Sequence, residues 1–216
     1  MLFHPDRPTL LISGSVDGLI AVHDVAVGPL DEDEGFCAAL NLETSVASMG
    51  VYGQRLWCTS GTEGLHLWDV LSACQEDNTD GSGAAAECPD ARNALSGSTA
   101  LPAVDYLVGA QWDGERLLLS AGTQAGGLGL FPVADVAPLL GAAPVATCAA
   151  GPHEAVVRAA VLVPGAPGVL VTGAEDSRVC VWAAGNPEGN PEGKPGAAVR
   201  EDRAVRKARG QRHMPY

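Results

Sequence analysis

The chain has 216 residues, 46% of them hydrophobic and 18% charged, which is enough apolar material for a sizeable core. It carries 26 acidic and 13 basic residues, a formal net charge of −13. This charge argues against nucleic acid as the main ligand of the folded part, because phosphate binding depends on basic surface. It is compatible with a basic protein partner, although acidity mostly reflects solubility.

The N-terminal residues 1–7 lack a basic start followed by a long apolar run, so we expect no signal peptide. The sequence also lacks the ~18 consecutive apolar residues that a membrane span requires. We therefore expect no membrane contact and an intracellular location, nuclear and/or cytoplasmic.

Four segments share one pattern: an apolar strand, a polar turn with glycine, and a second strand ending on an aromatic residue or histidine. They are residues 10–24, 56–69, 117–131 and 169–182. Their turn glycines are Gly14, Gly61, Gly122 and Gly173, at intervals of 47, 61 and 51 residues. These intervals approximate the ~40–45-residue period of a β-propeller blade with extra loop length.

In chain order, the repeats are expected at about residues 1–24, 36–69, 87–131 and 145–182. The first is incomplete, because only Leu2-Phe3-His4-Pro5 precedes its second strand. The second is expected to hold four strands and to begin a blade with the strand at 36–40. Residues 72–99, rich in small and polar side chains, predict an expanded loop. Trp112-Asp113 is interpreted as a hairpin turn because glycine follows it.

Residues 1–183 are therefore predicted to form propeller blades, and residues 184–216 a disordered tail. The tail begins with a Gly/Pro spacer at 186–196. A basic cluster follows, formed by Arg200, Arg203, Arg206, Lys207, Arg209 and Arg212. Two interpretations stay open for this cluster: a solvated end, or a nuclear-localising or RNA-touching segment that contacts RNA or an import receptor.

The repeats resemble the WD-repeat family, whose third strand ends in Trp-Asp. Trp68-Asp69 matches outright, His23-Asp24 keeps the aspartate, Trp182 keeps the tryptophan, and Phe131 keeps only an aromatic ring. The resemblance implies an all-β fold, a WD-repeat β-propeller. It also implies a non-enzymatic scaffold that mediates protein–protein interactions within a larger complex.

The resemblance further implies a buried structural tetrad of histidine, serine or threonine, aspartate and tryptophan. The matching positions are His153, Thr172, Asp176 and Trp182. Partial tetrads are expected at Ser13, Asp17 and His23 in the first repeat, and at Ser60 and Trp68 in the second. A nucleophilic triad of Thr, His and Asp is rejected, because the spacing is that of the structural network and the network would be buried.

Several stretches resemble, more narrowly, the family of WD repeat-containing protein 89 and its plant and algal relatives. They are Phe3-His4-Pro5, residues 13–19, 105–109, 153–158 and 172–176. They correspond to the latter part of such proteins, and plant relatives look linked to ribosome production. A nuclear RNA-associated or ribosome-assembly factor using the basic tail is therefore an alternative. A ubiquitin-ligase substrate receptor is less favoured, since the expected Arg after Trp-Asp is replaced by Val70-Leu71.

The sequence contains no phosphate-binding loop, nucleophile elbow or zinc-protease motif, so we expect no catalytic residue, cofactor or small-molecule substrate. The six cysteines show no C-x-x-C spacing, which makes a metal site unexpected.

Four repeats would cover roughly half of a seven-bladed ring. We therefore expect a partial, open arc of about 3.5–4 four-stranded blades, with an uncovered apolar face at each end. On this hypothesis the chain is the C-terminal part of a longer protein.

Overall fold

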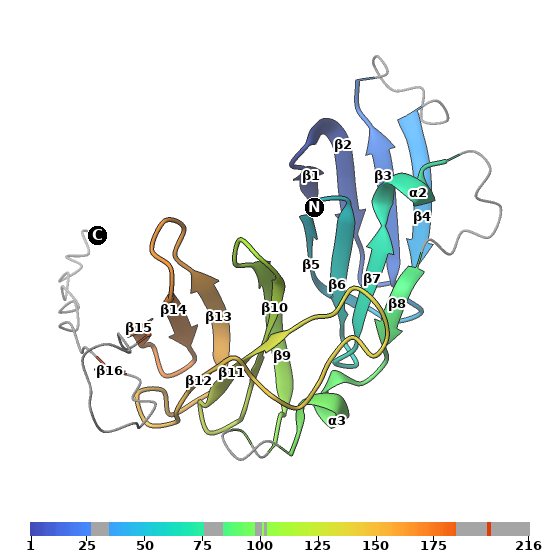
Figure 1. Cartoon of the computed structure of the whole chain (residues 1–216). Coiled ribbons are helices and arrows are strands. Elements are labelled where there is room, and N and C mark those ends of the chain that lie inside the picture. Colours follow the sequence, from blue (N-terminus) through green and yellow to red (C-terminus); the bar gives the residue numbers. More distant parts are fainter. Residues whose placement is uncertain (27–34, 76–83, 98–100, 102, 185–197, 200–216) are drawn as a thin grey trace, which may run out of the picture.

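The computed structural model describes residues 1–26, 35–75, 84–97, 101, 103–184 and 198–199. They form four antiparallel four-stranded sheets, each hydrogen-bonded in the order of the chain. Figure 1 shows the sheets following one another along an open arc, with β1–β4 at one end and β13–β16 at the other. The predicted all-β fold of four-stranded blades is confirmed.

The first two sheets take up the N-terminal half of the chain. The first sheet contains β1 (Leu2–His4), β2 (Arg7–Gly14), β3 (Leu19–Asp24) and β4 (Phe36–Asn41). The second contains β5 (Val46–Tyr52), β6 (Arg55–Ser60), β7 (Leu65–Asp69) and β8 (Ala84–Cys88). Two short helices flank β8, namely α2 (Val70–Ala73) and α3 (Ala91–Leu95). Asp69 and Asp90 cap them by accepting the N–H groups of Ser72 and Arg92.

The last two sheets repeat this meander. The third contains β9 (Tyr106–Trp112), β10 (Leu117–Gly122), β11 (Leu128–Pro132) and β12 (Ala146–Cys148). The fourth contains β13 (Val157–Leu162), β14 (Val169–Ala174), β15 (Val179–Ala183) and β16 (Ala198–Val199). The Trp112-Asp113 pair lies where the sequence placed it, at the hairpin between β9 and β10, with the Asp113 N–H bonded to the Arg116 carbonyl.

Sequence repeats and sheets are offset by one strand. The strand beginning at Phe36 was expected to open the second blade, but it pairs with β3 and completes the first sheet. The expected loop at 72–99 likewise contains β8, which pairs with β7, and α3. Each of the second, third and fourth repeats therefore contributes its first strand to the preceding sheet, which ties neighbouring sheets through the chain itself. Residues 76–83 and 98–99 of that expected loop lie outside the described residues.

Three apolar clusters hold the four sheets together, one between each neighbouring pair. We call the side of a sheet turned to the next sheet along the chain its forward face, and the opposite side its rear face. The forward faces contribute aliphatic pairs on the third strand: Ile20 and Val22, Leu65 and Leu67, and Leu128 and Leu130. The rear faces contribute one aromatic ring on the third strand: Trp68, Phe131 and Trp182. Each interface therefore packs a large ring against a flat aliphatic row.

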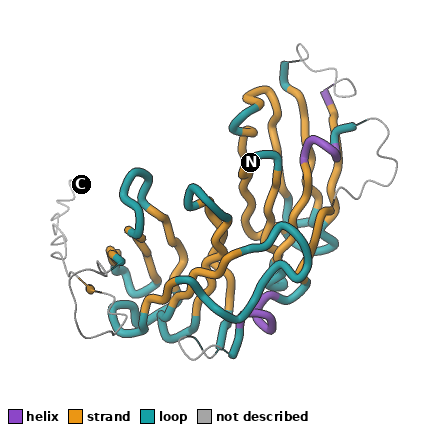
Figure 2. The backbone as a smooth tube through the Cα atoms, in the orientation of Figure 1, coloured by secondary structure: helices purple, strands orange, loops and turns teal. Residues whose placement is uncertain are grey.

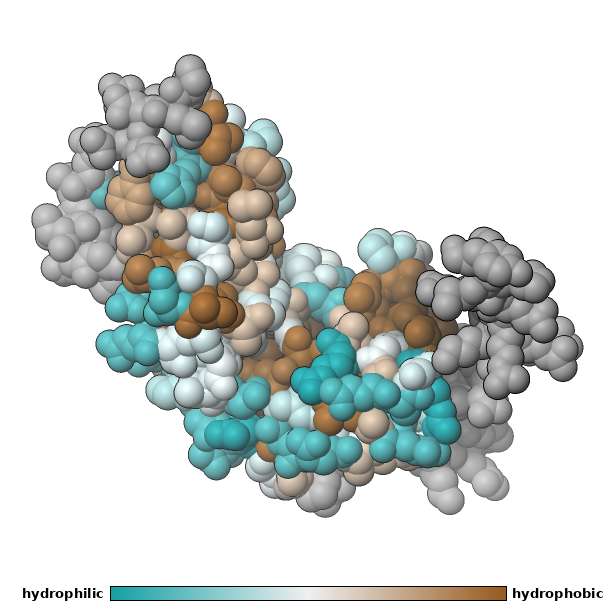
Figure 3. All heavy atoms as spheres, turned by 180° about the vertical axis from the view of Figure 1, so that it is seen from behind, coloured by the Kyte–Doolittle hydropathy of each residue, from teal (hydrophilic) through white to brown (hydrophobic). Residues whose placement is uncertain are grey.

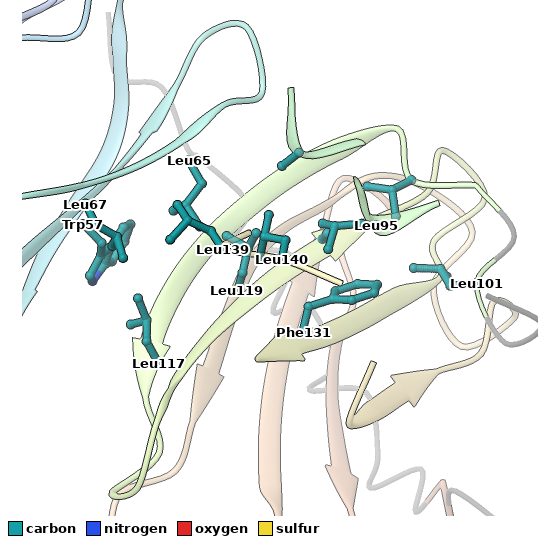
Figure 4. Packing of buried hydrophobic residues seen from close by; sticks show 13 residues of the cluster. Trp57, Leu65, Leu67, Leu95, Leu101, Leu117, Leu119, Phe131, Leu139 and Leu140 are labelled. Atoms are coloured by element: carbon teal, nitrogen blue, oxygen red, sulfur yellow. The ribbon is translucent and has the colours of Figure 1, made fainter. Parts of the chain in front are cut away.

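The middle cluster is the largest and draws in segments outside the sheets. Figure 4 shows Leu139 and Leu140 beside Leu119, and Leu95 of α3 near Phe131. Figure 2 shows the teal loop between β11 and β12, which supplies Leu139 and Leu140, crossing in front of the strands toward the second sheet. The joint between the second and third sheets is therefore closed by a helix and a loop as well as by strands.

Candidate functional site

The fourth sheet brings together the four predicted tetrad side chains. Trp182 Nε1–H donates to Thr172 Oγ1 at 2.8 Å, and Thr172 Oγ1 lies 2.7 Å from His153 Nε2. His153 Nδ1 lies 3.3 Å from Asp176 Oδ2. His153 is 0% exposed and Thr172 is 1% exposed. The four groups form one continuous hydrogen-bonded series from the core to the turn between β14 and β15.

The proton positions in this series follow from its acceptor end. A carboxylate can only accept, so a neutral imidazole must carry its proton on Nδ1, opposite Asp176. His153 Nε2 is then an acceptor, and the Thr172 hydroxyl donates to it while accepting from the Trp182 indole. Each buried polar group in the series has a partner of the right kind, which is the condition for such a network to stabilise a fold.

Asp176 connects the series to two loops. Its Oδ2 accepts the Glu154 N–H at 3.0 Å and its Oδ1 accepts the Arg178 N–H at 2.9 Å. Partial burial works to raise the pKa of Asp176, but these two N–H groups and His153 outweigh it and hold that pKa below its ordinary value of 3.8. The carboxylate therefore fixes the β14–β15 turn to the loop that presents His153.

The first sheet places Ser13, Asp17 and His23 at the corresponding positions. His23 lies opposite Leu11 on the neighbouring strand, just as Trp182 lies opposite Leu170. All three belong to the rear face or its turn, on the side where the described residues contain no preceding sheet. Asp17 accepts the Leu19 N–H within its own turn, at 3.0 Å. His23 packs edge-on against Phe36, with ring centroids 5.6 Å apart.

The second sheet does not use Ser60 as expected. Trp68 pairs with Leu56, and two residues further along β6 the residue equivalent to Thr172 is Cys58, not Ser60. Ser60 Oγ instead accepts the Gly64 N–H at 2.9 Å and lies 3.0 Å from Thr62 Oγ1. Matching the two turns by their glycines misplaced this serine by two residues. Trp68 stacks on His66, with ring centroids 5.6 Å apart.

The third sheet carries an apolar version of the same positions. Its register places Ala121 where Thr172 stands in the fourth sheet and Phe131 where Trp182 stands. Both side chains are fully buried in the middle cluster. The polar series is therefore replaced by packing, and the ring at the end of the third strand keeps its place.

Several side chains that join neighbouring sheets were not singled out as site residues. The Gln111 side chain bonds the β13 backbone twice, accepting the Leu162 N–H at 2.6 Å and donating to the Ala160 carbonyl at 3.2 Å. Tyr106 Oη accepts the Val157 N–H at 2.7 Å. Glu63 accepts the Leu107 N–H at 2.6 Å. The only sequence signal was Glu63 itself, which occupies the aspartate region of the second turn.

The remaining candidates for a site are weak within the described ranges. The described residues hold no group of three or more His, Cys, Asp or Glu side chains able to bind a metal ion. No helix among them is long and apolar enough to cross a membrane. A cavity of about 550 Å³ lies between the first two sheets, lined by Leu10, Cys37, Gln54 and Cys74 among others. None of the six cysteines forms a disulfide. The basic cluster at 200–212 lies outside the described residues.

The curated proteins and solved structures that are similar to this chain include the following three. "WD repeat-containing protein GTS1" of Arabidopsis thaliana is 30% identical over 226 aligned positions, covering 99% of this chain and 54% of that protein. "WD repeat-containing protein 89 homolog" of Dictyostelium discoideum is 37% identical over 73 residues, 32% of this chain and 20% of that protein. The chain thus spans about half the length of the first relative.

A chain in the crystal structure of a mitotic checkpoint complex matches with a TM-score of 0.53 and 17% identity. The match covers 82% of this chain and 46% of that one, and at this identity it concerns the fold alone. No protein-family model matches the sequence.

Proposed function

The chain belongs to the WD-repeat family, and on that premise we propose that it is a protein-binding scaffold, not an enzyme, working within a larger complex. The observation that carries the proposal is the state of the Thr172-His153-Asp176 constellation in the fourth sheet. His153 is fully buried, and its two ring nitrogens are engaged by Thr172 and Asp176. A nucleophile must reach its substrate, whereas this hydroxyl is occupied by an indole on one side and an imidazole on the other.

The proposed binding surface is one edge of the arc, which we call the turn edge. It comprises the turns at 15–18, 61–64, 123–127 and 175–178 and the loops at 42–45, 89–97, 103–105 and 149–156. Backbone hydrogen bonds join turn to loop, for instance from the Glu175 N–H to the Val156 carbonyl. These segments carry eight acidic and two basic residues. Figure 3 shows hydrophilic side chains, in teal, gathered along this lower edge of the molecule.

Rigid strands that present loops are the usual way in which a propeller binds proteins. The charge of the turn edge favours a partner segment rich in lysine or arginine. We place this activity inside the cell, in the nucleus and/or cytoplasm, and six cysteines that form no disulfide support a reducing compartment.

The test is affinity purification of the tagged full chain with identification of co-purifying proteins. A turn-edge variant, Glu43→Lys with Glu154→Lys, should lose the specific partner. A matched variant, Asp6→Lys with Glu115→Lys, makes the same charge change at exposed acids of the opposite edge and should keep it. Loss in both variants, or in neither, would contradict binding through the turn edge.

A second candidate function rests on the basic cluster, in which six of the chain's 13 basic residues occur within residues 200–212. We propose it as an RNA or import-receptor contact, either of which could serve a nuclear assembly factor. Replacing all six by Gln should abolish RNA recovery after crosslinking or nuclear accumulation while the melting curve stays unchanged. If RNA recovery and localisation both persist, the cluster has neither role.

A further inference from the structure

Cys37 and Cys74 belong to neighbouring sheets and line the same cavity. Cys37 lies on β4 of the first sheet, and Cys74 is the C-cap residue of α2, which follows β7 of the second sheet. Both line the cavity of about 550 Å³ between these sheets, and both pack against the apolar cluster that joins the two sheets. Figure 1 shows α2 beside β4, and the two elements are in contact. Two thiols far apart in the sequence therefore lie at one place in the fold.

A β-bulge turns the Cys37 side chain toward the second sheet. The partners of Phe36 and Ala38 on β3 are the adjacent residues His23 and Val22. Cys37, between Phe36 and Ala38, is therefore the extra residue of the bulge. A bulge re-aims a side chain, and the Cys37 side chain packs on the cluster between the two sheets.

The one-turn helix α2 sets the position of Cys74. The Cys74 N–H donates to the Val70 carbonyl at 3.2 Å and so closes the helical turn. The Cys74 thiol is in hydrogen-bonding contact with the Cys37 sulfur, while the Cys37 thiol donates to the Gly35 carbonyl at 3.6 Å. Neither thiol is fully buried, in contrast to Cys58. The two sulfur atoms therefore face each other in a place that is not enclosed by the core.

We propose that Cys37 and Cys74 are a site of oxidative modification, at which hydrogen peroxide joins the two thiols in a disulfide that links the first sheet to the second. The sulfur of one residue, as its thiolate, attacks a peroxide oxygen. The O–O bond breaks, and a sulfenic acid and one water form. The second sulfur then attacks the sulfenic sulfur, the S–S bond forms, and the hydroxyl group leaves with the second thiol's proton as another water. Two thiols are oxidised by two electrons, and the peroxide is reduced to two waters.

The surroundings of the pair decide how it responds to an oxidant. An S–S bond is about 2.05 Å long, so the sulfurs must approach further, and the position of Cys74 at a helix end allows this because helix ends fray. Burial, and then the adjacent Cys37, raise the pKa of Cys74 to about 11, although Arg7 opposes them. Since the thiolate is the reactive form, the disulfide forms under sustained oxidant and not in a brief pulse. In a reducing compartment such a disulfide is transient.

The bond should stabilise the chain, because it restricts the unfolded state between two sheets that otherwise only pack together. The pair lies outside the turn edge, so this proposal does not depend on the proposed binding surface. It therefore predicts a change in stability that can be measured without any partner.

The test treats the reduced full chain with hydrogen peroxide, alkylates the remaining thiols and maps the cysteines by mass spectrometry. Cleavage after arginine and glutamate places each of the six cysteines on its own peptide, so that any linked pair is identified. We expect a linked Cys37–Cys74 peptide and the loss of two of the six thiols. The oxidised chain should melt roughly 5–10 °C above the reduced chain, and added thiol should reverse this shift.

Serine variants separate this pair from the other cysteines. Cys37→Ser and Cys74→Ser should each abolish the linked peptide and the rise in melting temperature. Cys88→Ser, at another partly buried thiol of the second sheet, is the matched control and should keep both. Melting of each reduced variant shows that it folds. Sulfinic acids without a linked peptide, a disulfide between other cysteines or between two copies, or a linked peptide without a rise in melting temperature would each overturn the proposal.

Discussion

Every polar hydrogen in the tetrad has one acceptor, and the order of donors runs in a single direction from the indole to the carboxylate. Trp182 donates to Thr172, Thr172 to His153, and His153 to Asp176. The end residue sits at a turn, where its remaining oxygen lone pairs accept backbone N–H groups. At the residue scale the fourth sheet is therefore fixed by polar geometry, and the third by the buried ring of Phe131.

Removing the indole should destabilise the chain strongly. Trp182→Ala deletes a ring that is 5% exposed and also leaves the Thr172 hydroxyl without its donor, so we expect a loss of about 3–5 kcal/mol in the free energy of unfolding. Trp112→Ala is the control, because Trp112 is 47% exposed and contacts Tyr52 by stacking; it should cost about 1 kcal/mol or less. Denaturant unfolding measures both, and equal losses would show that the tetrad adds nothing.

The contribution of Asp176 should depend on pH. Its folded-state pKa is depressed, so its stabilisation is fully present above its ordinary pKa of 3.8 and is lost as the pH falls through the folded value. The difference in unfolding free energy between the parent and Asp176→Asn should therefore be constant from about pH 5 to 8 and shrink below about pH 4. Denaturant curves across that range test it. If this difference stays constant below about pH 4, the charge of the Asp176 carboxylate does not contribute to the stability of the turn.

At the scale of elements, local patterns were sufficient to place the hairpins but not to assign strands to sheets. The alternation and turn glycines of residues 10–24 and 169–182 predict β2–β3 and β14–β15, which the structure contains. The partner of β4 is decided by a contact with β3 across residues 25–35, and apolar alternation is the same whichever sheet the strand joins. The sequence pattern therefore located the strand and assigned it to the wrong blade.

The tetrad of the fourth sheet could be predicted from the sequence, whereas the partial tetrad of the second sheet could not be placed correctly, for a similar reason. In the fourth sheet all four residue types are present at the family's spacing. In the second sheet, Gly61 follows a hydroxyl residue as Gly173 does in the fourth. The strand pairing nevertheless places these two glycines two residues apart in register. Gln111 and Tyr106 form hydrogen bonds with the backbone of a neighbouring sheet. These bonds depend on how the two sheets face each other, and a local sequence pattern carries no information on that.

The β10–β11 turn should be intolerant of a side chain at Gly126. This residue has a φ of +87°, and an added Cβ would collide with the carbonyl group of His153. Gly114 also has a positive φ, of +109°, but nothing lies within 4 Å of its Cβ position. We expect Gly114→Ala to cost about 1–2 kcal/mol from backbone strain and Gly126→Ala clearly more. Thermal and denaturant unfolding measure the loss of stability in both variants. Equal losses would show that the loop carrying His153 can move aside to accommodate the added methyl group.

At the scale of the whole molecule, stability is shared only between neighbouring sheets. The second and third sheets have apolar clusters on both faces, whereas the first and fourth have one each. In such arrays the opening of one unit removes only its contacts with its neighbours, so end units open more readily than middle ones.

Hydrogen exchange should therefore distinguish end sheets from middle sheets. In the purified chain, the amides of β2–β3 and β14–β15 should exchange faster than those of β6–β7 and β10–β11, because fewer buried contacts are lost when an end sheet opens. Mass-spectrometric exchange on peptides from each hairpin supplies the measurement. Uniform protection would mean that the four sheets open as one cooperative unit.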